Sequence, residues 1–307
     1  MCNLFRADLF RMVRMRSFWV CVAVSVALML TVAGCLNWVA SPEFAHMVND
    51  SISEESLQGV SEADRAEMQA DVDEALQEIE PLNDKVMESL TDTWASTFMD
   101  GGFLALIGSL FAGIFLIMDF KGGFIKNLPF DRRGRIRYYA EKLIFVAFIQ
   151  LIFLVICAVF STLFFGIFGF SYEIQDGASG IVLWLLLVWL VCTAYAFIVA
   201  CVTWAIRSEA LSTVVVVVVS SGVVGAFAKQ LMYYLGTMLP AFAYVPQWML
   251  VSTFSDLRAG APALMDAGTE GVASMMSLAG HAALVACICI AVGAVVALVF
   301  CRKKDLR

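Results

Sequence analysis

Six long runs of apolar residues are separated along the chain by shorter polar or charged stretches. A helix that crosses a bilayer needs about 20 mostly apolar residues, and each run reaches about that length. The runs cover residues 17–40, 101–119, 143–170, 180–206, 211–235 and 276–300. This pattern predicts an all-α integral membrane protein with six transmembrane helices.

The basic residues between these runs indicate how the helices are oriented. Of the 20 Lys and Arg residues, 16 lie before the first run, between the second and third, between the fourth and fifth, or after the sixth. Cytoplasmic loops of membrane proteins are enriched in positive charge. We therefore expect both termini in the cytoplasm and residues 41–100 on the outer side.

Composition agrees with a membrane protein and narrows its partners. Hydrophobic residues make up 61% of the chain, charged residues 15%, and the mean hydropathy is +0.84, which excludes a soluble globular enzyme. Residues 41–100 hold sixteen of the 27 acidic residues but only Arg65 and Lys85 as bases. A clustered basic face outside the membrane is missing, so nucleic acid is not an expected partner.

The charge pattern also divides the chain into segments. Residues 1–16 mix arginines with apolar residues, which favours a cytoplasmic interfacial helix, although the arginines alone would also orient the first span, 17–40. Residues 41–100 form an acidic extracytoplasmic segment, with amphipathic helices expected over 61–99. Residues 101–307 form a five-span region, in which 229–275 is too broken by proline and charge to span and is expected to form short helices at the outer face.

Val32 to Cys35 resemble the cleavage box of a bacterial lipoprotein, but the long apolar run and the spread arginines favour an uncleaved anchor.

Motifs for catalysis or cofactor binding are scarce. The sequence has no phosphate-binding G-x-x-x-x-G-K-[ST] motif and no clustered Cys and His residues of zinc-site spacing, so neither a cofactor nor a metal site is predicted. Ser220 or Ser221 with His281 could form an intramembrane hydrolase, but serine and glycine more often permit close helix packing. Ionisable residues are nearly absent from the middle of the runs, which disfavours a proton- or sodium-coupled transporter.

The segment 119–142, between the second and third runs, is the most distinctive part of the sequence. It contains Gly123, Ile125, Lys126 and Asn127, then a basic stretch, and Lys142 at the start of the third run. In this pattern the chain resembles permease subunits of the ABC-2 superfamily of ATP-binding-cassette exporters, especially antimicrobial-peptide and lantibiotic-immunity permeases. The basic lead, the six spans and the large outer insertion after the first span agree with that family plan.

The resemblance implies a permease in a bacterial plasma membrane, driven by a separate cytoplasmic ATPase that supplies the ATP hydrolysis. The chain itself would not be an enzyme. The segment after the second span would be the coupling helix, in which an apolar ridge docks on the ATPase and the charges set the register. The residues expected to make this contact are Lys121, Gly122, Gly123, Phe124, Ile125, Lys126, Asn127, Leu128, Arg132 and Arg133.

The resemblance also implies a dimer, of identical chains or with a sister permease. Small residues on the fifth span are the expected interface: Ser212, Ser220, Gly222 and Gly225. The outer acids are a solvated surface or a receiving site for cationic cargo; the candidates are Glu54, Glu55, Glu62, Asp71, Asp73, Glu74, Glu78 and Glu80. The alternative function is a membrane sensor or accessory protein that uses the acidic outer helices as its receptor.

Overall fold

The computed structural model describes residues 2–44, 47, 85–121, 132–174, 176–206, 208–265 and 276–303. Two predicted sites lie wholly or largely outside these residues. All eight candidate cargo-facing acids fall within 48–84, and the centre of the expected coupling segment falls within 122–131. Their functional interpretation therefore stays a prediction from sequence.

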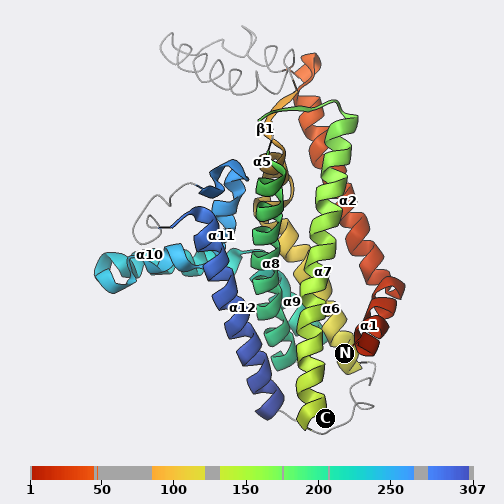
Figure 1. Cartoon of the computed structure of the whole chain (residues 1–307), viewed down its shortest axis with the longest axis vertical. Coiled ribbons are helices and arrows are strands. Elements are labelled where there is room, and N and C mark those ends of the chain that lie inside the picture. Colours follow the sequence, from red (N-terminus) through yellow and green to blue (C-terminus); the bar gives the residue numbers. More distant parts are fainter. Residues whose placement is uncertain are drawn as a thin grey trace, which may run out of the picture.

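The described chain is an all-α bundle arranged around one central helix, α8 (Figure 1). Helix α8, Ala178–Ile206, is apolar on all sides, and it packs against α6, α7, α9 and α12. A helix without a polar face is stable only where every side meets apolar surroundings. The surrounding helices are α2 (Arg16–Val39), α6 (Phe103–Lys121), α7 (Arg132–Ile167), α9 (Glu209–Ser220) and α12 (Leu278–Lys303).

Within the described residues, four unbroken helical stretches are long and apolar enough to cross a membrane. They are Arg16–Val39, Ile136–Ile167, Ala178–Ile206 and Leu278–Val299. Two further candidates are bent pairs: Leu90–Met99 with Phe103–Asp119, bent by 54°, and Ala210–Ser220 with Val223–Met238, bent by 53°. The fold therefore carries four to six candidate spans, and it reaches six only if each bent pair counts as one.

The fifth predicted run, 211–235, is not the single helix that its apolar pattern predicts. It divides into α9 and α10 (Val223–Met238), and α10 projects sideways from the bundle in Figure 1. The break lies at Gly222, whose φ of +76° is a left-handed conformation that glycine adopts without steric penalty. The residues on both sides of this glycine are apolar, so hydropathy alone could not reveal the turn.

Part of the segment expected to be helical, 61–99, is instead extended. Strand β1, Val86–Ser89, pairs in parallel with β2, Ser171–Ile174, 85 residues further along the chain. The helical expectation is therefore wrong for residues 86–89, because a distant strand supplies hydrogen-bond partners that local periodicity cannot reveal. Short helix α5, Leu90–Trp94, follows, then a π-helical turn, Ala95–Met99, and a 3-10 turn, Asp100–Gly102.

The described part of the broken segment 229–275 forms short helices, as predicted. After α10 come η4 (Pro240–Phe242), η5 (Val245–Trp248), α11 (Leu250–Asp256), η6 (Leu257–Ala259) and η7 (Pro262–Met265). Prolines lie in the first turns of three of them, where their fixed φ suits a helix start. This segment is anchored to the bundle by Trp184 of α8, whose indole N–H donates to the Leu257 carbonyl at 2.9 Å.

One end of the bundle collects several chain segments that are distant in sequence. Helix α1, Cys2–Arg14, lies there with the end of α6, the start of α7 and the end of α12, whereas β1 lies at the opposite end (Figure 1). Three of the segments predicted to be cytoplasmic thus lie at one end of the molecule, and the side of the membrane that this end faces stays a prediction.

Candidate functional site: an ionic network beside the predicted coupling segment

The predicted coupling segment is flanked in the structure by two helices of the bundle. Lys121 ends α6, and Arg132 and Arg133 begin α7, which runs unbroken for 36 residues to Ile167. At 1.5 Å per residue α7 is about 54 Å long, well beyond the ~30 Å hydrocarbon thickness of a bilayer. The basic stretch that was expected to precede the third span is therefore the first part of the same helix.

Buried charges join these two helices to α1. The Lys142 ammonium of α7 donates to Asp8 Oδ2 of α1 at 2.6 Å and lies 2.8 Å from Asp119 Oδ2 of α6. All three side chains are completely buried. Helix α1 and the helices that contain the second and third predicted spans thus meet at one ammonium group.

Arg11 and Tyr138 complete the coordination of Asp119. The Arg11 guanidinium donates to Asp119 Oδ1 at 2.7 Å, and the Tyr138 hydroxyl donates to Oδ2 at 2.9 Å. The Phe115 ring lies beneath both cations, with the Lys142 ammonium 4.9 Å and the Arg11 guanidinium carbon 5.4 Å from its centroid. A cation over an aromatic face is stabilised by the ring quadrupole, especially where water is excluded.

Glu141 adds a third carboxyl group to the same cluster. Its side chain is buried, it interacts with Asp8, Lys142 and Asp119, and neither of its oxygens accepts a hydrogen bond from the described residues. The cluster Asp8, Arg11, Asp119, Tyr138, Glu141 and Lys142, hereafter the ionic network, thus contains two cations and three carboxyl groups. Among the described residues, the network therefore holds one more carboxyl group than it has cations.

Energetically, the ionic network makes the three helices depend on one another. Taking charges out of water is expensive, and a buried pair compensates only while both partners are present. Removal of Lys142 would leave two buried carboxylates without their shared cation. The ends of α6 and α7 therefore have one strongly preferred arrangement relative to α1.

The sequence analysis missed most of this network. Lys142 was recognised only as part of a motif, Asp119 only as the start of the segment, and Asp8 not at all. Asp8 is the lone acid among the arginines of the chain start, and this exception was the available signal. Its partner Arg11 lies three positions away, but its buried partner Lys142 lies 134 positions away, so no local pattern could pair those two.

Each of the four residues predicted for the dimer interface has a structural role within one chain. Ser212 is buried and donates to the Thr203 hydroxyl of α8 at 3.1 Å, and Ser220 is also buried. A Cβ on Gly225 would lie 3.0 Å from the Val251 Cβ, so this glycine allows α10 to approach α11 closely. Gly222 forms the break described above. These contacts explain the small residues without a partner chain, and the dimer interface stays a prediction.

The residues considered for hydrolysis do not form a nucleophile and base pair. Within the described chain, neither the Ser220 hydroxyl nor His281 Nε2 has a hydrogen-bond partner. The Ser221 hydroxyl donates to the Val218 carbonyl at 3.1 Å instead, and His281 packs against the Trp248 ring. The described residues also contain no group of three or more His, Cys, Asp or Glu side chains placed to hold a metal ion.

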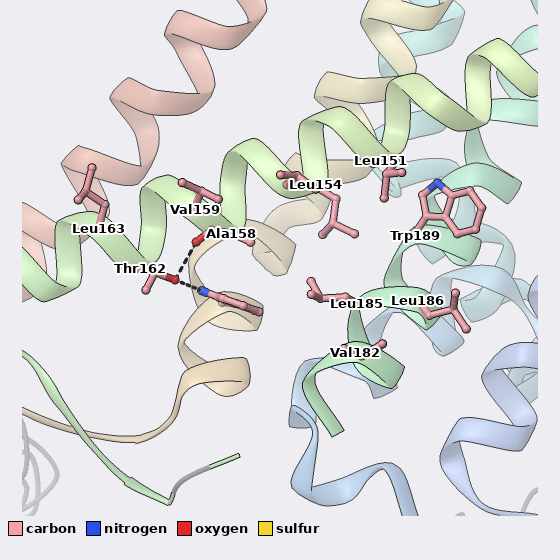
Figure 2. A pocket seen from close by; sticks show the side chains of 12 residues that line it. Leu151, Leu154, Ala158, Val159, Thr162, Leu163, Val182, Leu185, Leu186 and Trp189 are labelled. Atoms are coloured by element: carbon pink, nitrogen blue, oxygen red, sulfur yellow. Dashed lines mark hydrogen bonds between the residues drawn. The ribbon is translucent and has the colours of Figure 1, made fainter. Parts of the chain in front are cut away.

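An apolar groove of about 630 Å³ lies between α7 and α8 (Figure 2). Its two polar groups of note are already paired: the Trp94 indole N–H donates to the Thr162 hydroxyl at 3.0 Å, and the Trp189 indole N–H donates to the Ala147 carbonyl. Val155, on one wall, is half-exposed. The groove therefore suits hydrocarbon and offers little to a polar ligand.

No protein-family model matches this chain, and no curated protein matches it either. The functional interpretation consequently depends on the residues and their geometry alone.

Proposed function

We propose that this chain is the membrane-spanning permease subunit of an exporter driven by a separate cytoplasmic ATPase, and that residues 119–142 receive the ATPase. The observation that carries the proposal is the ionic network. It joins α1 to the two helices that flank the coupling segment, through contacts between Lys142, Asp8 and Asp119.

A coupling segment needs a rigid connection to the membrane helices. If its two ends were not held in place, a displacement of the segment would change only its own conformation and would not move the helices. Asp119 lies two residues before the end of α6, and Lys142 lies ten residues after the start of α7. A displacement of the segment between them would move both helices and α1 together. The network provides the discrete, strongly paired arrangement that a two-state transmission requires.

The connection extends further, to the central helix α8. Tyr139 packs edge-on against the Trp204 ring, with centroids 4.6 Å apart, and Trp204 lies close to the end of α8. The Ser212 to Thr203 hydrogen bond joins α9 at nearly the same level. Movement at the coupling segment would therefore reach the middle of the bundle through buried contacts.

The test is co-expression with a candidate cassette ATPase from the same genome, followed by purification through a tag on the membrane subunit. We expect a stable complex whose ATP hydrolysis differs from that of the free ATPase. The variant Asp8→Asn should keep the ATPase bound while reducing this effect on hydrolysis, because Asp8 touches the transmission path and not the docking surface.

The matched control is Glu88→Gln, which removes an exposed carboxylate at the opposite end of the bundle and should change neither binding nor hydrolysis. A well-folded membrane subunit that captures no ATPase would contradict the proposal and favour the sensor alternative. An Asp8→Asn complex with unchanged hydrolysis would remove the network from the transmission path.

A further inference from the structure

The two bends in the candidate spans meet at a second cavity, of about 300 Å³. It is lined from one side by Gly101 and Gly102 at the start of α6, and from the other by Ser220, Gly222 and Val223 at the junction of α9 and α10. All three glycines have positive φ, and a Cβ on Gly102 would lie 3.5 Å from the Ser221 carbonyl oxygen. We call this cavity the break pocket.

Helix α10 begins at the break pocket without a cap. Its N-cap residue is Gly222, which has no side chain, and the first amide that donates within the helix is that of Ala226, to the Gly222 carbonyl at 2.7 Å. The amides of Val223, Val224 and Gly225 therefore have no acceptor inside the 16-residue helix. Unsatisfied N–H groups and the positive end of the helix dipole favour an anion.

Two side chains in the lining add to this preference. Ser220 is 1% exposed, and its hydroxyl has no hydrogen-bond partner in the described chain, which leaves a buried donor available to a ligand. Arg258, from η6, also lines this cavity; its guanidinium already interacts within the chain, and its five N–H groups can donate to more than one acceptor. Uncapped amides, a hydroxyl and an arginine are the groups that bind phosphate oxygens.

One carboxyl group lies near this cavity without lining it. Burial raises the pKa of Asp256, and the positive charges of Lys229 and His281 act on it in the opposite direction. The net effect is a raised pKa and so a weaker negative charge, and Asp256 does not line the cavity, so it opposes an anion there only weakly.

The outer surface of α10 indicates what kind of molecule carries the anion. No residue of α10 is buried, and one apolar stripe with spacings of three and four residues runs along the helix from the break pocket: Val223, Phe227, Leu231, Tyr234 and Met238. Each of these side chains is about half to three quarters exposed. An apolar stripe that begins at an oxyanion pocket matches a molecule with a phosphate head and hydrocarbon chains.

We propose that the break pocket binds the phosphate group of a membrane phospholipid, whose acyl chains lie along the exposed apolar stripe of α10. The uncapped α10 amides, Ser220 and Arg258 donate to the phosphate oxygens. This site is independent of the proposed transport function, since it would exist in a sensor or an accessory protein equally well.

The experiment is native mass spectrometry of the detergent-purified full chain, titrated with four probes. They are dihexanoyl phosphatidylglycerol, dihexanoyl phosphatidylcholine, dihexanoylglycerol without a phosphate, and inorganic phosphate. We expect both phospholipids to bind one per chain, and the other two probes to bind far more weakly. If dihexanoylglycerol bound as tightly as the phospholipids, the proposed phosphate contact would be wrong. If inorganic phosphate bound as tightly, the proposal that the ligand is a lipid would be wrong.

Variants locate the site. Arg258→Gln and Ser220→Ala should each lower the affinity for phosphatidylglycerol. For the arginine variant we expect the dissociation constant to rise about tenfold. Arg258→Lys should restore part of that loss, which separates lost charge from misfolding. The matched control Arg6→Gln removes an exposed cation from α1, which does not line the pocket, and should leave binding unchanged. Equal losses in Arg258→Gln and Arg6→Gln would mean general charge attraction and no site.

A second copy of the chain is the competing occupant of the stripe. The double variant Phe227→Ser and Tyr234→Ser should weaken phospholipid binding and leave the oligomeric state as it is. Conversion of a dimer to a monomer with unchanged lipid binding would assign the stripe to the partner chain and overturn the proposal.

Discussion

The ionic network and the break pocket are both polar regions inside an apolar bundle, but they satisfy their polar groups in opposite ways. In the network, Lys142 and Arg11 are paired with Asp8 and Asp119 at 2.6 to 3.4 Å. In the break pocket, donors such as the Ser220 hydroxyl have no partner in the described chain. Polar groups paired within the protein hold helices together, whereas unpaired donors mark a place for something else to bind.

Glu141 is the exception that makes this comparison informative. It belongs to the network, yet its buried oxygens accept no hydrogen bond from the described residues. In the network, Lys142 is therefore paired with two carboxylates, whereas the Glu141 carboxyl group, next to the predicted coupling segment, accepts no hydrogen bond from the described residues. Changes there should alter function more readily than changes at Lys142, which should first alter stability.

The largest effect is expected from removal of the shared cation. Lys142→Met leaves Asp8 and Asp119 buried without it and should lower the free energy of unfolding by about 3–5 kcal/mol. Unfolding in mixed micelles measures this loss. The control Lys229→Met removes a partly exposed cation outside the network and should have little effect.

Adding Asp8→Asn to Lys142→Met should recover part of that loss, because one unpaired carboxylate disappears. Strictly additive losses, or a single-variant loss below about 1 kcal/mol, would show that the network is not a mutually dependent unit.

The next largest effect is expected from changes in the predicted coupling segment, 119–142. Phe124→Ala with Ile125→Ala should weaken ATPase binding by about 2 kcal/mol or more, because apolar anchors at an interface centre carry much of the affinity. Arg132→Gln with Arg133→Gln should do less, and its effect should depend on salt. The ratio of ATPase to permease in pull-downs at low and high salt measures both; full binding by the double alanine variant would contradict the docking assignment.

A smaller effect is expected where α10 meets α11. Gly225→Leu places a side chain against Val251 and should destabilise the fold by about 1–3 kcal/mol. It should also lower the yield of cross-linked dimer, if the predicted interface is correct. Gly34→Leu, at a position with open space around the glycine, is the control. An unchanged dimer yield from folded Gly225→Leu protein would locate the interface elsewhere.

The smallest effect is expected in the break pocket itself. In lipid-free detergent, Arg258→Gln should change the free energy of unfolding by no more than about 0.5 kcal/mol, as surface substitutions usually do. The same unfolding assay then separates the two regions directly. A loss as large as that of Lys142→Met would mean that Arg258 supports the fold as strongly as the ionic network does.

Two features were predictable from local sequence, for physical reasons. Long apolar runs must form helices in a membrane, because every backbone polar group has to be satisfied within its own segment. The positions of α2, α8 and α12 therefore follow closely from hydropathy. The short helices of the described part of 229–275 follow from prolines, which favour helix starts and interrupt longer helices.

The tertiary structure decided what hydropathy cannot express. Gly222 is one glycine in an apolar run, and only its φ of +76° shows that α9 ends there. Likewise Val86 pairs with Ser171, and Lys142 pairs with Asp8, although these residues lie 85 and 134 positions apart in the chain. The sequence by itself determined which segments are apolar helices and which end of the bundle is basic. Which charges are buried together, and where two helices break, depended on partners that only folding brings within hydrogen-bond distance.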